Sequence, residues 1–183
     1  MISDEEYKKL LKQFHKLSDR HILVVETDMP YSDVLKVVIL SDKIRKAGNE
    51  LVSFMRKNYD QLIRTKKYRK LLKLYGSTKD KKKRKDLADQ LNEMQKAYNV
   101  TWDYCRKSMI PIGKKYGINA VFALTKAEDV WRGIEKCLYG NGKAIHFSKY
   151  GELPCIRAKQ INRGIPISVK DDRLQFKLGK TAF

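Results

Sequence analysis

The sequence has few of the residues that build disulfide frameworks, metal sites or membrane spans. Its three cysteines and three histidines are scattered and form no C-x-x-C or H-x-x-x-H pair, so we expect reduced cysteines and no zinc ribbon. No apolar run approaches the ~20 residues of a membrane-spanning helix. The first residues, Met1 to Glu6, lack the basic start of a secretory signal. These absences predict a cytoplasmic protein that holds no metal and no cofactor and does not enter a membrane.

Motifs of known catalytic chemistry are also lacking. No G-x-S-x-G, P-loop or G-x-G-x-x-G sequence occurs. In the second half of the chain the adjacent acidic pairs are Glu128-Asp129, interpreted as an exposed helix edge, and Asp171-Asp172, interpreted as a turn. A two-metal nuclease needs several carboxylates that converge on two ions. We therefore expect no catalytic residues and no catalysis by the isolated chain.

Positive charge, in contrast, is abundant and unevenly placed. The 183 residues carry 40 Lys and Arg against 21 Asp and Glu, a net charge of +19. Residues 56–85 hold fourteen basic and two acidic side chains. Cations at this density repel one another, and a polyanion would relieve the repulsion while releasing its own counterions. Binding of nucleic acid is therefore the favoured role of this stretch. The two alternatives are a solvated helix face that only maintains solubility and a stretch that binds a membrane surface.

Helical periodicity fills the middle of the chain. A capping box at Ser3 to Glu6 predicts a short N-terminal helix. A long helix should begin near Ser32 and be interrupted at Gly48, where a glycine either permits the close approach of another backbone or simply weakens the helix. Gly113 to Gly117 is expected to be a basic turn. Further helices are predicted over residues 58–75, from or just after the Lys79–Lys85 run, from Trp102 toward Pro111, and from Asn119 to Tyr139 with a left-handed cap in Gly140 to Gly142.

Strand-like sequences lie on both sides of the helical region. One covers His21 to Thr27, and four follow Gly142, over residues 143–147, 154–158, 165–169 and 173–178, with a hairpin signal at Lys170-Asp171-Asp172. This order predicts an α+β fold in which a small β-barrel-like unit is interrupted by a helical insertion of about five helices. The predicted parts are an N-terminal helix (1–20), a β-barrel-like unit (21–31 and 140–183) and the insertion (32–139).

The predicted barrel is incomplete, which has a consequence for its last strand. Arg173 to Leu178 would lie at an open edge of the sheet, with unpaired backbone N–H and C=O groups. We therefore expect this strand to pair with a second copy of the chain or with another polypeptide.

Basic residues interleaved with aromatic residues predict where nucleic acid would bind. Lys and Arg contact phosphates, and Tyr or His can stack on bases, although each tyrosine has the alternative of a half-buried core position. The pattern occurs on a predicted helix, on the predicted turn near Lys115, and just after the first strand of the predicted β-unit. The predicted nucleic-acid-binding residues are Lys66, Lys67, Tyr68, Arg69, Lys70, Lys73, Lys81, Lys82, Lys83, Arg84, Lys85, Lys114, Lys115, Tyr116, Lys143, His146, Lys149, Tyr150, Arg157, Lys159 and Arg163.

The order of elements also carries a family resemblance. Val24-Val25, Pro30 and Asn49 suggest a strand, a turn and a long helix with an Asn near its middle. A helix over residues 127–140 is followed by Gly142-Lys143, Phe147-Ser148-Lys149 and, later, the stretch 174–180. Over residues 21–180 this order resembles the N-terminal part of the transposon-encoded TnpB nucleases and the related type V CRISPR effectors. In that family a helical recognition lobe interrupts a wedge-like β-barrel, and the two bind guide RNA and its duplex with target DNA.

The resemblance implies an RNA-binding and target-DNA-binding module of an RNA-guided nuclease system. Its implied partners are a guide-like RNA, target DNA, and either a RuvC-type nuclease subunit or a second copy of the chain. The family's RuvC-type acidic triad and zinc-ribbon cysteines have no counterpart in this sequence, so no catalytic residue is carried over. Two alternatives stay open: a generic basic RNA-binding or ribosome-associated protein, and a nucleic-acid enzyme with an unrecognised site.

Overall fold

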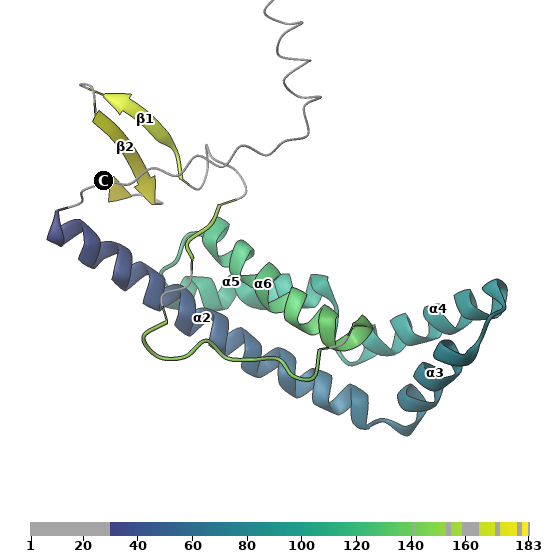
Figure 1. Cartoon of the computed structure of the whole chain (residues 1–183). Coiled ribbons are helices and arrows are strands. Elements are labelled where there is room, and N and C mark those ends of the chain that lie inside the picture. The colour runs from purple at the N-terminus through teal and green to yellow at the C-terminus, as the bar shows by residue number, and fades with distance from the viewer. Residues whose placement is uncertain are drawn as a thin grey trace, which may run out of the picture.

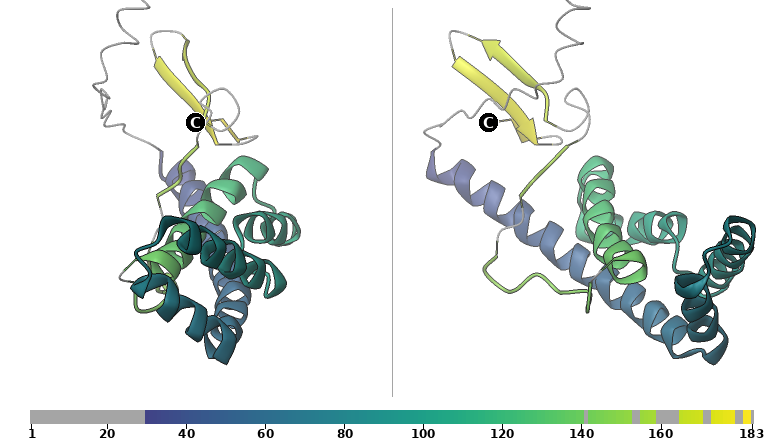
Figure 2. Two further views of the ribbon diagram at one scale, coloured as in Figure 1. Left: turned by 90° about the vertical axis from the view of Figure 1, so that its right-hand side faces the viewer. Right: turned by 45° about the vertical axis from the view of Figure 1, so that its right-hand side comes forward.

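Helices dominate the molecule (Figure 1). The computed structural model describes residues 30–140, 142–152, 155–158, 165–170, 173–178 and 181–182. Within these residues a long helix packs against two others, and a hairpin of two helices extends from the end of the long helix (Figures 1 and 2). The helices are α2 (Tyr31–Arg64), α3 (Lys66–Ser77), α4 (Lys81–Ala97), α5 (Trp102–Tyr116) and α6 (Ala120–Tyr139).

The core lies where α2, α5 and α6 meet. Leu51 and Met55 of α2 are fully buried, as are Met109 of α5 and Ile134 of α6, and Phe122 is nearly so. Burial of one such side chain contributes roughly 1.5–3 kcal/mol to folding. The apolar periodicity of these helices is thus the main source of stability for this three-helix body.

The α3–α4 hairpin is joined to this body by a small apolar cluster and a chain of hydrogen bonds. Leu71 of α3 and Leu91 of α4 are buried. The Tyr139 hydroxyl at the end of α6 donates to Gln95 Oε1 over 2.7 Å, and Gln95 Nε2 donates to the buried Tyr68 hydroxyl over 3.4 Å. Buried polar groups that lose such partners cost free energy, so this chain of contacts orients the hairpin relative to α6.

Side-chain caps place the helix starts. Thr101 accepts from the Tyr104 amide to begin α5, and Asn119 accepts from the Val121 amide to begin α6, the start predicted from the sequence. The start of α4 lies inside the basic run 79–85. There the Asp80 carboxylate accepts from the amides of Lys82 and Lys83, over 2.8 and 3.3 Å. The carboxylate thus provides an acceptor for two amides that would otherwise be unpaired. Its negative charge also offsets the helix dipole, which disfavours lysines at a helix N-terminus.

Several predicted helix boundaries were wrong, each for a local reason. Gly48 does not interrupt α2, since one glycine costs a helix only about 1 kcal/mol, and Lys126 of α6 packs over the space that its missing side chain leaves. The predicted turn at Gly113 to Gly117 is the last turn of α5, which passes through Pro111 and ends at Tyr116, followed by the left-handed cap Gly117 with φ 65°. Gly140 is extended rather than left-handed, and the amides of Gly140 and Gly142 both donate to the Lys136 carbonyl.

Three short strands form the described β-structure. Strands β1 (Ile167–Lys170), β2 (Arg173–Leu178) and β3 (Thr181–Ala182) are antiparallel in the order β1-β2-β3. Lys170 pairs with Arg173, which confirms the predicted hairpin between these strands. Leu178 is buried and Phe176 is half-buried.

The predicted α+β fold with a β-barrel-like unit is wrong. The helices have 34, 12, 17, 15 and 20 residues, whereas the strands have 4, 6 and 2, so the described chain is predominantly helical and its strands close no barrel. The predicted strand at 143–147 has no regular structure, and neither have residues 155–158, the described part of the predicted strand at 154–158. The predicted N-terminal helix and the strand at His21 to Thr27 lie outside the described residues. β2 pairs with β1 over residues 173–176 and with β3 at residues 177 and 178, so among the described residues each position of β2 has a strand partner on one side only. The expected pairing of this strand with a second copy or with another polypeptide stays a prediction.

The cap of α4 gives the first testable prediction. Asp80→Ala should destabilise the first turns of α4 by about 1 kcal/mol, because two amides lose their acceptor. Hydrogen exchange of the Lys82 and Lys83 amides should accelerate. Asp80→Asn should retain the protection, because Asn caps as well as Asp does.

Asp86→Ala is the matched control, because it removes the same charge from an exposed site within the same helix. Equal acceleration in the Asp80→Ala and Asp86→Ala variants would show that charge, and not the cap, holds the start of α4.

Candidate nucleic-acid interface

The α3–α4 hairpin gathers about half of the predicted binding residues on one structural unit. The cations of α3 and of the first turns of α4 are all exposed: Lys66, Lys67, Arg69, Lys70, Lys73, Lys81, Lys82, Lys83, Arg84 and Lys85. Tyr68 does not belong with them, because its side chain is only 2% exposed. Burial raises the pKa of its hydroxyl, which accepts from Gln95. Tyr68 therefore holds the hairpin together and does not offer a ring for stacking.

These hairpin cations lack acidic partners. Within the described ranges, every ion pair involves other residues, and none joins a carboxylate to a cation of α3 or of the first turns of α4. Arg84 lies 4.7 Å from the ring centroid of Tyr75, a cation–π contact across the hairpin. The positive charge of the hairpin is therefore available to an external anion.

The second predicted cluster, at the end of α5, is largely engaged within the protein. Lys115 Nζ and the Tyr116 hydroxyl both donate to Glu50 Oε2, over 2.7 and 2.9 Å. The Lys115 ammonium, followed by the Tyr116 hydroxyl, holds the pKa of the Glu50 carboxyl below its usual value. Lys114 is exposed and takes no part in this contact. This cluster ties α5 to α2 and leaves Lys114 as the cation best placed to meet a ligand.

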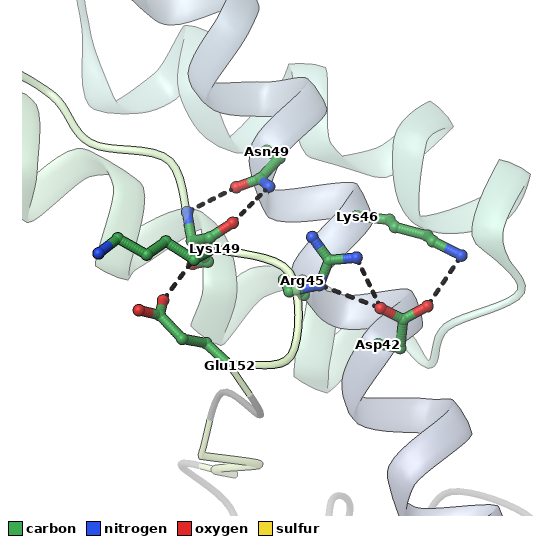
Figure 3. A network of polar contacts seen from close by, with 7 residues as sticks. Asp42, Arg45, Lys46, Asn49, Lys149 and Glu152 are labelled. Carbon is green, nitrogen blue, oxygen red and sulfur yellow. Dashed lines mark hydrogen bonds and ion pairs between the residues drawn. The ribbon is translucent and has the colours of Figure 1, made fainter.

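The third cluster lies on a segment that runs back along α2 after α6, residues 142–152, which we call the strap (Figure 1). Asn49, in the middle of α2, fixes it through both ends of its amide. Asn49 Nδ2 donates to the Ser148 carbonyl and Asn49 Oδ1 accepts from the Ser148 amide, each over 2.9 Å (Figure 3). The Lys149 amide donates to Glu152, which closes the following turn. An extended segment without strand partners is thereby held in a defined place.

The strap presents its predicted binding residues to solvent. Lys143, His146, Lys149 and Tyr150 are exposed, and the Tyr150 side chain is 91% exposed. One face of the Tyr150 ring lies near Arg45, with the guanidinium carbon 5.5 Å from the ring centroid. Arg45 is itself held by Asp42, which also pairs with Lys46 (Figure 3). Of the predicted tyrosines, Tyr150 alone is free to stack on a base.

The remaining predicted residues do not extend this surface. Arg157 pairs with Asp129 of α6, which raises the pKa of the guanidinium. Lys159 and Arg163 lie outside the described residues. The structure thus brings together the hairpin cations and, separately, the strap residues, and it assigns internal partners to Lys115, Tyr116 and Arg157.

The sequence analysis missed one basic and aromatic site. An open pocket of about 430 Å³ on α2 is lined by the cations Arg56, Lys57 and Arg64 and by Phe147 of the strap. Asp60 also lines it, with Oδ2 4.0 Å from Arg56 Nε. The Phe147 side chain is 45% exposed. The three cations were part of the positive stretch 56–85, but nothing in the sequence indicated that Phe147, 83 residues beyond Arg64, would lie beside them. This pocket lies on α2, next to the start of the hairpin.

Other kinds of site are not apparent in the part of the chain that the structure describes. It holds no cluster of three or more His, Cys, Asp or Glu side chains that could bind a metal ion. Its three cysteines are free thiols, and burial raises the pKa of Cys105 to about 12, so this thiol stays protonated. No described helix combines the length and the apolar character that crossing a membrane requires.

Comparison with models of known protein families, with curated proteins and with solved structures finds no match to this chain. The functional interpretation therefore rests on the charge and geometry of the surfaces described above.

The Asn49 contact leads to a prediction about the strap. Asn49→Ala removes both hydrogen bonds to Ser148 and should destabilise the fold by about 1–3 kcal/mol, twice the net value of one hydrogen bond. The Ser148 amide should then exchange rapidly with solvent.

Asn58→Ala is the matched control, because Asn58 makes a single, long hydrogen bond of 3.5 Å to the Asn99 carbonyl. If the Ser148 amide stays protected in the Asn49→Ala variant, the strap is held by other contacts and Asn49 is not its anchor.

Proposed function

We propose that this protein is a nucleic-acid-binding module whose α3–α4 hairpin binds the phosphate backbone of RNA. The observation that carries the proposal is the set of exposed hairpin cations without acidic partners in the described chain. In free protein these charges repel one another across two packed helices. A polyanion would remove that repulsion and would release counterions of its own, which makes binding favourable and strongly dependent on salt.

The dimensions of the hairpin suit a backbone ligand. The twelve residues of α3 extend over about 18 Å, and cations occupy several of its solvent-facing positions. Lys66, Lys70 and Lys73 are spaced i, i+4 and i+7, so they line one side of this helix. Such a row follows phosphates without reading base edges, which makes it suitable for duplex or folded RNA.

The strap and the α2 pocket suit unpaired nucleotides. Tyr150 and Phe147 offer exposed rings beside cations, and aromatic stacking beside a positive surface is the usual way in which proteins hold single strands. We infer that a folded RNA with both helical and unpaired parts engages the hairpin through its helix and the strap through its unpaired bases.

The more specific proposal, based on the family resemblance, is that this RNA is a guide and that target DNA pairs with it. In that case base pairing supplies the sequence specificity and the protein binds the duplex through its backbone, in the cytoplasm and without catalysis of its own. The identity of the RNA that co-purifies with the chain distinguishes the alternatives. One structured species supports a guide, ribosomal RNA supports a ribosome-associated protein, and metal-dependent cleavage by the purified chain would support an enzyme.

Charge removal on α3 tests the proposed interface. Replacement of Lys66, Lys67, Arg69 and Lys70 by Gln should weaken binding of an RNA hairpin, as measured by fluorescence anisotropy over a series of KCl concentrations. Each lost phosphate contact should reduce the slope of log affinity against log salt by about 0.7–0.9. The fold should be retained, because all four side chains are exposed.

The matched control replaces Lys36, Lys46, Arg106 and Lys107 by Gln, which removes the same net charge from cations already paired with carboxylates. The proposal predicts a smaller change in slope for this control. Equal slopes and equal affinities in the two variants would show that the protein attracts RNA by net charge alone and that the hairpin is no binding site.

A further inference from the structure

A cleft beneath the strap has a chemistry of its own. It lies between α2 and α6, is covered by the beginning of the strap, and has a volume of about 410 Å³, which is within the ~300–1,000 Å³ range of small-ligand sites. Gly48 and Asn49 of α2 line one wall, and Lys126 and Gly133 of α6 line the opposite wall. The Ser148 backbone that Asn49 holds lies at the edge of this cleft, so the strap cannot leave without opening it.

Lys126 is unusual among the lysines whose burial the structure describes, because it is partly withdrawn from solvent whereas the others are exposed. Its methylenes lie directly on Gly48, where an added Cβ would come within 2.2 Å of Lys126 Cε. Burial lowers the pKa of the Lys126 ammonium, and the charge of Asp129 opposes this effect. Among the described residues no carboxylate lies within ion-pair distance of Lys126, and the Asp129 carboxylate is engaged by Arg157. A cation held in this way gains most from an anion that enters the cleft.

The remainder of the lining is suited to the same ligand. Lys136, Lys143 and His146 contribute further nitrogen donors, whereas Asp129 is the one acidic residue of the lining. Gly133 leaves open space, because a Cβ there would meet nothing nearer than Ile145 at 4.0 Å. Lysines that line an open cleft provide the kind of positive charge with which proteins bind phosphoryl groups.

We propose that this cleft binds a phosphoryl group, carried by the terminus of a nucleic-acid strand or by a free nucleotide, with Lys126 as its principal ligand. Gly48 is the residue that permits this role, because its missing side chain provides the space along which Lys126 lies. The proposal does not depend on the function of the α3–α4 hairpin, because the cleft is formed by other elements and can be probed with a mononucleotide.

The test compares ligands that differ only in a phosphate. Binding of adenosine 5′-monophosphate and of adenosine is measured by calorimetry on the full chain. In parallel, a 3′-fluorescein RNA oligonucleotide with either a 5′-phosphate or a 5′-hydroxyl is titrated by anisotropy. We expect the phosphate to improve the affinity about tenfold in at least one of these pairs, which is the effect of one charge-assisted contact.

Two variants remove Lys126 from the cleft by different routes. Lys126→Met deletes the charge, whereas Gly48→Ala keeps every charge but fills the space in which the lysine lies, and Ala is a good residue for a helix interior. Both should abolish the preference for phosphate. Lys43→Met removes an exposed lysine of α2, and Gly76→Ala fills a helical glycine with nothing within 4 Å, so both controls should retain the preference.

Each outcome supports or overturns the proposal. If the wild-type chain binds the monophosphate more tightly than adenosine, and both test variants lose this preference, the ligand of the cleft is a free nucleotide. If the phosphate improves affinity only in the RNA pair, and both test variants lose this effect, the ligand is the terminus of a nucleic-acid strand. If the wild-type chain discriminates in neither pair, or if a preference persists in folded Lys126→Met and Gly48→Ala proteins, as checked by circular dichroism, the cleft is not a phosphoryl site.

Discussion

Repulsion among the cations of α3 and the first turns of α4 is the constraint around which this structure is arranged. Two helices of like charge pack side by side only if other interactions exceed the repulsion. Here these are a narrow apolar contact that includes Leu71 and Leu91, the Asp80 cap, and the hydrogen bonds from Tyr139 through Gln95 to Tyr68. The fold therefore retains a charge that destabilises it in the free state, and an anionic partner would relieve that cost.

The rest of the molecule holds this hairpin in a fixed position and adds a second kind of surface. Helices α2, α5 and α6 share the main apolar core, and α2 continues from that core to the start of the hairpin (Figure 2). The same helix holds the strap through Asn49, 99 residues distant in sequence from Ser148. The exposed hairpin cations and the exposed aromatic rings of the strap are thus both connected to one long helix. A ligand with both duplex and unpaired parts could contact both at once.

The sequence predicted the features that depend on local periodicity and charge. The start of α6 after Asn119 and the turn between β1 and β2 follow from caps and turn residues that act over a few positions. The location of the hairpin cations followed from their density alone. Features set by long-range packing were not predictable. Gly48 lies inside a continuous helix and against a lysine 78 residues later, and the buried Tyr68 hydroxyl accepts from Gln95 of α4, which in turn accepts from Tyr139 of α6. The same limit produced the predicted barrel, because short runs with apolar residues such as 143–147 resemble strands, whereas the segment that contains this run is held along α2 by a side-chain amide.

The most direct test of the central claim is the nucleic acid that the full chain retains when it is purified gently. The account predicts that material prepared at low salt carries RNA, visible as a raised ratio of absorbance at 260 and 280 nm, and that high salt strips it. It further predicts that the hairpin variant with Gln at residues 66, 67, 69 and 70 retains much less RNA than its charge-matched control. Wild-type protein that is free of nucleic acid at low salt, or equal retention by the two variants, would contradict the account.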